Sequence, residues 1–371
     1  MDDTSASGAK PTVLYALHQE LGGKIVPFAG YALPVQYPAG IMAEHKQARE
    51  AAALFDVSHM GQVKLTGADR VAALEALVPA DLAGLAVGRQ RYSFFTNDAG
   101  GILDDLMISN QGEWLFLVVN AACKEADIAH LKAGLKGDVT LSELTDRALV
   151  AVQGPKAAAV LARLAPGVQT LKFMDCKPVE VAGAACLVSR SGYTGEDGYE
   201  ISVPADKAEA LVRRLLDEDE VAPAGLGARD SLRLEAGLCL YGHDIDTTTT
   251  PVEADLVWAM QKRRRQEGGF PGAAVVQKQL AEGAGRRRVG LQPEGRAPMR
   301  EGTVLQNAQG EDVGVVTSGG FGPTLGAPVA MGYVTADLAA EGTALQAVVR
   351  GKAMPCRVAA LPFVPHNYFR G

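Results

Sequence analysis

Residues Asn97 to Asn120 read NDAGGILDDLMISNQGEWLFLVVN, so two glycines and two carboxylates stand where an apolar strand begins. Gly100 and Gly101 lack a side chain and therefore allow the backbone to approach a neighbour or a ligand closely. Successive side chains of a strand point to opposite faces. One of Asp104 and Asp105 must therefore face inward or into a cleft, and the other must face water.

Two explanations fit an inward carboxylate at this position. A turn in which the aspartate caps local amide groups is the simpler one for an isolated Asp-Asp pair. A chemical role is favoured by a second segment of the same kind, RSGYTGEDGYEISVP at residues 190–204, which again combines glycines with carboxylates. That segment stands in the same position within a second copy of the same pattern of elements.

The chain between residues 62 and 216 predicts this pattern twice, each time as a strand, a helix, three strands and a helix. LTGADRVAALEALVP and VQGPKAAAVLARLAP show the shared layout of strand, glycine, alanine-rich helix and proline. Two such βαββ-type units form mixed or antiparallel sheets with helices on one face, an α+β arrangement. If they face each other about a pseudo-twofold axis, their carboxylates converge in a cleft suited to a small ligand. The predicted elements are 62–67, 68–78, 91–97, 103–109, 114–120 and 121–135, then 148–155, 156–164, 178–183, 185–193, 198–204 and 205–216.

Segments on either side of the repeat carry other signals. A short amphipathic helix over 12–21 ends at two glycines. Residues 24–61, rich in aromatics and prolines, predict an irregular wall. From residue 285 onward, short strands between glycine turns predict a small β-barrel or sandwich.

A helix predicted over 228–240 carries Arg229 and Arg233 four residues apart, and hence on one face. Arg229 lies in the first turn, where a cation opposes the helix dipole. This placement favours a specific carboxylate or a ligand oxygen as its partner, and a surface ion pair is the alternative.

Length and charge narrow the class of protein. The 371 residues, 47% of them hydrophobic, predict two or three packed domains. A net charge of −7 argues against nucleic acid as the main partner, because phosphate binding needs a basic face. No run of about 18 apolar residues predicts a membrane span. Residues 1–10, MDDTSASGAK, resemble neither a secretion signal nor a mitochondrial presequence, so a cytoplasmic location is expected.

Cysteines and histidines stand singly along the chain. The five cysteines form no CxxC pair, which indicates buried thiols in a reducing compartment. The six histidines show no helical or finger spacing, so no structural metal is expected. Neither a GxGxxG after a strand nor a GxxxxGK[ST] occurs, which argues against the usual dinucleotide and nucleotide-phosphate sites.

Several motifs, taken in order, closely resemble the aminomethyltransferase (T-protein) family of the glycine cleavage system. The resemblance runs from about Leu14 to Tyr368 and rests on FAGYALPVQY, FDVSHMG, FTNDAGGILDDL, LVVNAACKEAD, SGYTGEDGYEISVP, ARDSLRLEAGLCLYGHDID and PFVPHNY. It implies a three-domain, cloverleaf-like α+β fold with two ferredoxin-like βαββ-type units and a C-terminal small β-barrel. The domains implied are a discontinuous folate-binding domain (1–55 and 140–280), a second α+β domain with the catalytic aspartate (56–139) and the barrel (281–371).

The resemblance also implies roles for individual residues. The second aspartate of GGILDDL, Asp105, matches the family's catalytic acid, and Glu200 of GEDGYE matches the carboxylate that binds the pterin's donor edge. Arg229 and Tyr368 match positions that bind the substrate or folate. Further candidates for the folate pocket are Asn120, Tyr92, Met60 and Tyr193, the last two only as apolar walls. Tyr31 stands where related folate-binding proteins often have tryptophan, and it preserves an aromatic wall.

The activity implied is transfer of an aminomethyl carbon from the lipoyl-bearing H-protein to tetrahydrofolate. Tetrahydrofolate enters as a substrate, and no metal, nucleic acid or membrane takes part. The location implied is the cytoplasm, as in bacteria.

Two other functions remain possible on the sequence alone. One is a folate-dependent demethylase or the folate domain of a sarcosine- or dimethylglycine-oxidising enzyme, which handles small sulfonium or amine substrates without a lipoyl carrier; the GGILDDL and PFVPHNY motifs argue against it. The other is a non-catalytic, folate-binding assembly factor for iron–sulfur proteins. Such factors depend on a reactive cysteine in a Lys-Gly-Cys-type motif, which this sequence lacks.

Overall fold

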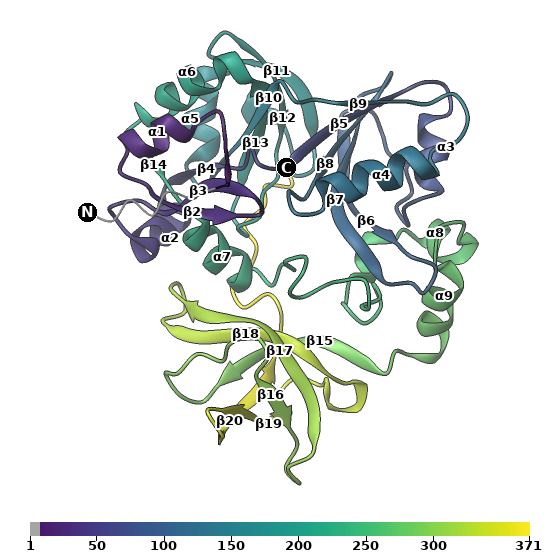
Figure 1. The fold of residues 1–371 in the computed structure, drawn as a ribbon. Coiled ribbons are helices and arrows are strands. Elements are labelled where there is room, and N and C mark those ends of the chain that lie inside the picture. Colours follow the sequence, from purple (N-terminus) through teal and green to yellow (C-terminus); the bar gives the residue numbers. More distant parts are fainter. Residues whose placement is uncertain (1–7) are drawn as a thin grey trace.

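The computed structural model describes residues 8–371 and divides the chain into three lobes (Figure 1). A six-stranded sheet forms the first lobe, a five-stranded sheet the second, and a closed barrel the third. Residues 1–7, which belong to the segment in which we expected no targeting signal, lie outside the described residues.

The six-stranded sheet has the order β11-β12-β13-β10-β4-β14, antiparallel except for the parallel pair β4 and β14. Its strand β10 reads RALVAVQ, an almost continuous apolar run, and is buried on both faces. The strands are β4 (Ala52–Asp56), β10 (Arg147–Gln153), β11 (Cys176–Val181), β12 (Ala184–Ser189), β13 (Gly198–Pro204) and β14 (Val221–Pro223).

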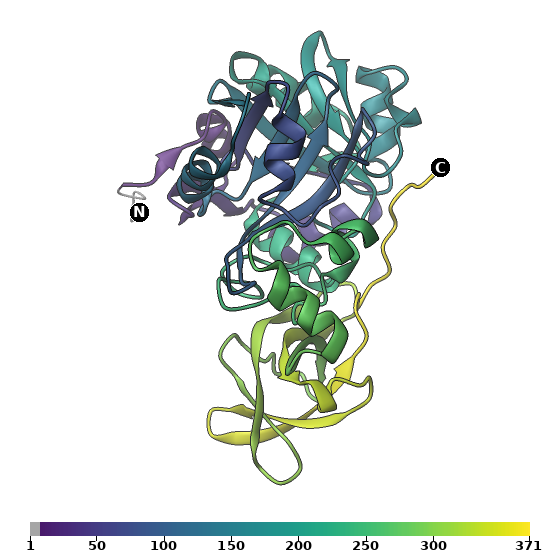
Figure 2. The same ribbon diagram turned by 90° about the vertical axis from the view of Figure 1, so that its right-hand side faces the viewer.

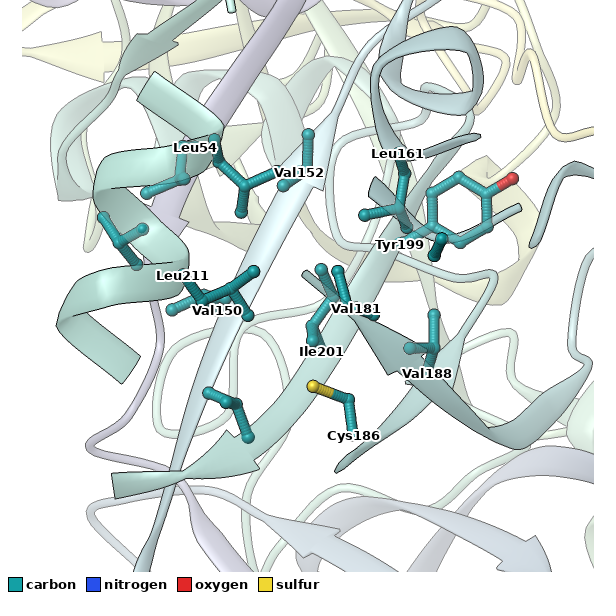
Figure 3. Packing of buried hydrophobic residues seen from close by; sticks show 14 of the residues in the cluster. Leu54, Val150, Val152, Leu161, Val181, Cys186, Val188, Tyr199, Ile201 and Leu211 are labelled. Atoms are coloured by element: carbon teal, nitrogen blue, oxygen red, sulfur yellow. The ribbon is translucent and has the colours of Figure 1, made fainter. Parts of the chain in front are cut away.

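Helices cover both faces of this sheet, whereas the sequence predicted helices on one face. Val150 and Val152 of β10 point into a core closed by α1, α5 and α6. Figure 3 shows both valines in this core with Leu161 of α5 and Leu211 of α6. Leu149 and Ala151, one position out of phase, point into a second core closed by α2 and α7. The helices are α1 (Tyr15–Glu20), α2 (Ile41–Glu50), α5 (Ala157–Leu164), α6 (Ala205–Leu216) and α7 (Leu226–Glu235).

The predicted irregular wall at 24–61 is wrong, because this segment is largely regular. It supplies strand β4, helix α2 and most of a small sheet of order β1-β3-β2. Pro27 and Pro34 of this segment occupy strands of the small sheet, and Pro27 lies on its edge strand β2, where a missing amide costs little. Its strands are β1 (Lys10–Pro11), β2 (Lys24–Phe28) and β3 (Tyr31–Gln36).

The five-stranded sheet has the order β6-β7-β8-β5-β9, with α3 (Arg70–Glu75) and α4 (Lys124–Gly134) packed on it (Figure 1). The strands β6-β7-β8-β5 follow the same order as β11-β12-β13-β10, so the predicted internal repeat is confirmed. The strands are β5 (Gly61–Thr66), β6 (Arg89–Thr96), β7 (Ile102–Asn110), β8 (Leu115–Val119) and β9 (Thr140–Glu143).

The two sheets meet directly through apolar side chains and a buried hydrogen bond. Phe116 of β8 packs against Cys176 and Leu187 of the six-stranded sheet. A buried hydrogen bond from Ser202 Oγ to Gln62 Oε1 (2.5 Å) also joins the sheets.

The domain boundaries given above stay a prediction, with one local correction. Strand β9 pairs with β5 in the five-stranded sheet, although the prediction placed residues from 140 onward in the folate-binding domain. The apolar side chains of β9 carry no clear signal for either sheet, because only one of its four residues is apolar.

The connection from α7 to the barrel packs against the five-stranded lobe. Phe94 and Ile102 of that lobe share a core with Ile245 and Phe270. The connection contains α8 (Lys262–Glu267) and α9 (Ala273–Glu282).

The predicted C-terminal barrel is confirmed as a closed barrel of order β15-β18-β17-β16-β19-β20. After it, the last residues run back along the side of the other lobes, as Figure 2 shows. The strands are β15 (Arg286–Pro293), β16 (Val304–Gln306), β17 (Asp312–Gly322), β18 (Ala327–Thr335), β19 (Ala344–Val349) and β20 (Lys352–Ala359).

Glu235, at the end of α7, joins the barrel to the six-stranded lobe. Its carboxylate accepts hydrogen bonds from the Thr324 amide of the barrel (2.8 Å) and from Arg49 Nη2 of α2 (3.0 Å), and lies 3.1 Å from His45 Nε2. Burial alone would raise the pKa of Glu235, but these partners hold it down at about 2. Arg49 Nη1 in turn donates to the Thr194 carbonyl (2.7 Å), which lies in the second Gly-rich segment.

Candidate functional site

The first Gly-rich turn is built by Asn97 and two glycines. The Asn97 side-chain oxygen accepts hydrogen bonds from the amides of Ala99 (3.0 Å) and Gly101 (2.9 Å), and Gly100 has a φ of 82°. A Cβ on Gly101 would lie 1.9 Å from the Thr247 carbonyl oxygen. The close approach predicted for these glycines therefore occurs, and the neighbour is backbone of the connection that follows α7.

Strand β7 sends the two aspartates to opposite faces. Asp104 is fully buried, and Asp105 is half-buried rather than open to water as the alternation alone suggested. Asp105 accepts hydrogen bonds from Tyr92 Oη (2.8 Å) and from Asn120 Nδ2 (2.7 Å). Asn120 Nδ2 also reaches Asp104 Oδ1 (2.9 Å), so one amide group bridges both carboxylates.

The surroundings of Asp105 bring its pKa to about 7. Burial is the largest cause, and the nearby charge of Asp104 adds to it. The hydrogen bonds from Tyr92 and Asn120 act in the opposite direction, because they favour the ionised form. A carboxyl group that titrates near neutrality can hold or release a proton under ordinary conditions.

A second acid, Asp127 of α4, lies behind this pair. Asp127 is 2% exposed and shares a hydrogen bond with Asp104, which also contacts the Cys123 thiol. Burial and the charge of Asp104 raise the pKa of Asp127 to about 10. Two carboxyl groups in hydrogen-bond contact must share a proton. Asp127 therefore holds that proton and donates it to Asp104.

Replacing Asp127 by Asn should change the free energy of unfolding by less than about 1 kcal/mol, because the amide can still donate to Asp104. Asp127→Val removes the donor and should destabilise the protein by about 1–3 kcal/mol. Urea titration at pH 7 measures both. If Asp127 were ionised instead, Asp127→Asn would relieve repulsion between two buried carboxylates and would clearly stabilise the protein.

The second carboxylate, Glu200, lies on β13 and is half-buried. Ser191 Oγ donates to Glu200 Oε2 (2.9 Å), which fixes one side of the carboxylate. The Gly-rich segment beside it is held by a bidentate pair, in which Arg190 Nε and Nη2 donate to the two oxygens of Asp197 at 2.9 and 2.6 Å. The free side of Glu200 is therefore presented by a rigid segment.

Tyr193 and Arg229 contact each other, and each is influenced by the charge of one of the two carboxylates. The Arg229 guanidinium lies 4.9 Å from the centre of the Tyr193 ring. After burial, the charge of Glu200 is the largest influence on the pKa of Arg229, and that of Asp105 is among those on the pKa of Tyr193, which burial raises. The structure therefore brings Asp105, Glu200, Arg229 and Tyr193 together, and Tyr92 and Asn120 join them through Asp105.

Met60, predicted as an apolar wall of the site, packs with the core beneath α7. Its neighbour His59 is buried, with its ring centre 5.7 Å from that of Phe28 and 6.3 Å from that of Tyr31. Burial lowers the pKa of His59 to about 4, so its ring is neutral near pH 7.

The Tyr368 ring contacts Phe173 and His366. Its ring stacks on Phe173 at 4.1 Å with an interplanar angle of 6°. Burial raises its pKa to about 12, and the charged groups that influence it are Arg370, Arg49 and Glu196. Its predicted role at the ligand therefore has no support from direct contact with the other candidates.

Comparison with known proteins shows which proteins this chain resembles. Residues 14–264 match the GCVT N-terminal domain, and residues 286–365 match the glycine cleavage T-protein C-terminal barrel domain. The chain is 46% identical to a mitochondrial aminomethyltransferase of Dictyostelium discoideum, with 98% of this chain and 95% of that protein covered. It is 48% identical to the mitochondrial aminomethyltransferase of Flaveria trinervia, covering 99% and 92%. The crystal structure of the glycine cleavage system aminomethyltransferase T from Bartonella henselae matches with a TM-score of 0.93 and 45% identity, covering 97% and 99%.

The chain belongs to the glycine cleavage T-protein family. The resemblance noted in the sequence is thereby confirmed, and with it the three-lobed α+β fold. The barrel domain of the family coincides with strands β15 to β20. Within residues 8–371, no helix is long and apolar enough to cross a membrane, and no group of His, Cys, Asp or Glu is arranged to hold a metal ion.

Four polar residues that contact the sequence candidates or Tyr31 were not singled out from the sequence: Asp127 contacts Asp104, Ser191 contacts Glu200, and Lys124 and His59 both approach Tyr31. His59 and Ser191 lie inside the quoted motifs FDVSHMG and SGYTGEDGYE, so their motifs were a usable signal. Asp127 and Lys124 lie on α4. The sequence of this helix mixes acids and bases, so it does not indicate which face contacts Asp104 or Tyr31.

Proposed function

We propose that this chain is the aminomethyltransferase of a glycine cleavage system, using lipoyl H-protein and tetrahydrofolate to give 5,10-methylenetetrahydrofolate, ammonia and dihydrolipoyl H-protein. The observation that carries the proposal is the pairing of Asp105, which titrates near pH 7, with Glu200 and Arg229 across Tyr193. This arrangement offers one acid for proton transfer and a second charged pair for holding a ligand.

Glu200 and Arg229 fit the polar edge of a pterin. A pterin presents a 2-amino group and a ring N–H side by side, and a carboxylate accepts such paired N–H groups in a bidentate manner. The adjacent ring carbonyl needs a donor. Arg229 Nη1 is buried and has no hydrogen-bond partner within residues 8–371, so it can supply that donor.

In the reaction, a folate amine nitrogen attacks the aminomethyl carbon and the carbon–nitrogen bond to the departing ammonia breaks. The second folate nitrogen then closes the ring as the carbon–sulfur bond breaks and the sulfur takes up a proton. Two folate N–H protons are thus passed on, one to ammonia and one to sulfur. Asp105, as carboxylate, accepts and relays a proton at the attacking nitrogen and stabilises the cationic intermediate. Holding both reactants in attack geometry supplies much of the remaining acceleration.

Because Asp105 acts as a carboxylate, kcat/KM should fall as the pH drops below about 7. Tyr92→Phe removes a hydrogen bond that favours the ionised form of Asp105. The acid limb of the pH profile should therefore move to higher pH, by roughly one unit. Tyr15→Phe, on α1, is the control and should leave the profile unchanged. If the acid limb of the pH profile does not move in Tyr92→Phe, that limb does not report the ionisation of Asp105.

The assay that tests the function measures methylenetetrahydrofolate formed from aminomethylated H-protein. Demethylation of a small sulfonium or amine substrate in its place would favour the rival enzymes, and the absence of any turnover would favour the assembly factor. The cytoplasmic location stays a prediction, and the relatives from Dictyostelium discoideum and Flaveria trinervia are mitochondrial proteins.

A further inference from the structure

Two acids behind Asp105, Asp104 of β7 and Asp127 of α4, take no direct part in the proposed reaction. Asp104 is fully buried and Asp127 is 2% exposed, and the two side chains share a hydrogen bond. Asp127 Oδ2 is buried and receives no hydrogen bond within residues 8–371, as expected of an oxygen that carries a proton. Carboxyl groups buried this deeply cost folding free energy, so their place beside the catalytic acid calls for an explanation.

Asn120 connects these two acids to Asp105. Its backbone amide donates to Asp104 Oδ2 (3.1 Å) and its side-chain amide to Asp104 Oδ1 (2.9 Å), so Asp104 holds the asparagine at two points. The same side-chain amide donates to Asp105 Oδ1 (2.7 Å), and Tyr92 Oη donates to Asp105 Oδ2 (2.8 Å). Both oxygens of Asp105 are thus fixed in place, one of them through a group that Asp104 orients.

The groups that face Asp105 are mostly neutral or acidic. Burial, with the charge of Asp105 as a further cause, raises the pKa of Tyr92 on β6, Cys123 and Asp127 on α4, Tyr193 in the second Gly-rich segment and Cys239 in the connection after α7. The pKa of Tyr241, in the same connection, is raised by burial, Cys123, Asp104, Asp246 and Asp127. The cations that act on Tyr193 or Cys239 are Arg229, Arg233 and Arg288. After burial, the charge of Asp104 is the largest influence on the pKa of Asp105, and it raises that pKa.

We propose that Asp104 and Asp127, here called the Asp104–Asp127 pair, share one proton and use their single negative charge to orient Asn120 and to make Asp105 a stronger base. This inference rests on the proposed function. Without a neighbouring negative charge, the carboxylate of Asp105 would be a weaker acceptor for a proton from a folate nitrogen. With a second charge in the pair, Asp105 would stay protonated at neutral pH. The shared proton keeps the charge at one.

The test compares the pH dependence of kcat/KM in two variants of similar shape. Asp104→Asn removes the charge, because burial keeps Asp127 protonated, and the acid limb should move to lower pH by about one unit. Asp127→Asn keeps the charge on Asp104 and a donor to it, so the limb should stay in place. The direction expected for Asp104→Asn is opposite to that expected for Tyr92→Phe.

Glu125→Gln is the matched control, because Glu125 is an exposed acid on the same helix as Asp127. Its substitution removes a negative charge from α4 and should leave the limb unmoved. A pair with a merely structural role would lower the free energy of unfolding in its variants without moving the limb. Urea titration of each variant measures this free energy and establishes that the variant is folded.

Carbon-13 labelling of the aspartate carboxyl groups gives a second readout that does not depend on turnover. In the unaltered protein at pH 8, NMR should show one protonated carboxyl group in the Asp104–Asp127 pair, and its signal should disappear in Asp127→Asn. The titration of Asp105 should move to lower pH in Asp104→Asn. Should Asp104→Asn not fold, the spectrum of the unaltered protein decides, since two protons or none in the pair overturns the inference.

The outcomes separate this inference from the proposed function. If the acid limb stays in place in a folded Asp104→Asn, or moves equally in Asp127→Asn, the pair does not tune Asp105 even though the enzyme turns over. If the unaltered protein forms no methylenetetrahydrofolate, the proposed function fails, and the NMR titration of Asp105 then tests the pair by itself.

Discussion

Asp105→Asn should reduce kcat by about a hundredfold or more while tetrahydrofolate still binds. Asparagine has nearly the same shape and can still accept the hydrogen bond from Tyr92, so the hairpin keeps its geometry. What it cannot do is take up a proton near pH 7 or offer a negative charge to the cationic intermediate. Single-turnover rates of methylenetetrahydrofolate formation, together with the folate dissociation constant, measure the two effects separately.

Asp98→Asn is the matched control for this experiment. Asp98 lies seven positions earlier, in the same Gly-rich turn, and is exposed to solvent. Its substitution should leave both constants unchanged. A near-normal rate for Asp105→Asn would remove Asp105 from the mechanism, and a loss of folate binding alone would reassign it to ligand recognition.

Glu200→Gln should weaken folate binding by roughly ten- to a hundredfold, because hydrogen bonds to a charged group contribute about 1.5–3 kcal/mol. The glutamine amide also presents a donor where the pterin's amino edge presents donors of its own. The loss should appear in the dissociation constant and in KM for tetrahydrofolate. Glu180→Gln, at an exposed position of β11 in the same sheet, is the control. An unchanged dissociation constant would refute the role of Glu200 at the pterin edge.

Much of the fold could be predicted because its signals are local. The repeat rests on glycine, alanine-rich and proline landmarks within each unit, and the strand orders β6-β7-β8-β5 and β11-β12-β13-β10 confirm it. The segment 24–61 was misjudged because prolines and aromatics are also compatible with short strands at the margin of a domain. The second helical layer was missed because the alternation of β10 is masked when both faces are apolar.

Only the site residues that strand alternation or a sequence motif indicates could be predicted. Alternation predicted that one of Asp104 and Asp105 faces inward, and the structure shows that Asp104 is the fully buried one. The proton on Asp127 depends on a helix packing over Asp104, and the position of Lys124 depends on Tyr31 from a distant segment. Neither contact can be recognised from the sequence near the residues involved. The position of Tyr368 against Phe173 likewise follows from how the chain's last residues pack.

The buried carboxylate of Glu235 links the barrel, through Arg49, to the segment that precedes Glu200. The same guanidinium, that of Arg49, contacts Glu235 with one nitrogen and the segment carrying Thr194 and Glu196 with the other. Moving the barrel loop at Thr324 should therefore disturb the contacts of Arg49 with the segment that precedes Glu200. A barrel exchanged between relatives should thus fit only if the partners of Glu235 are exchanged with it.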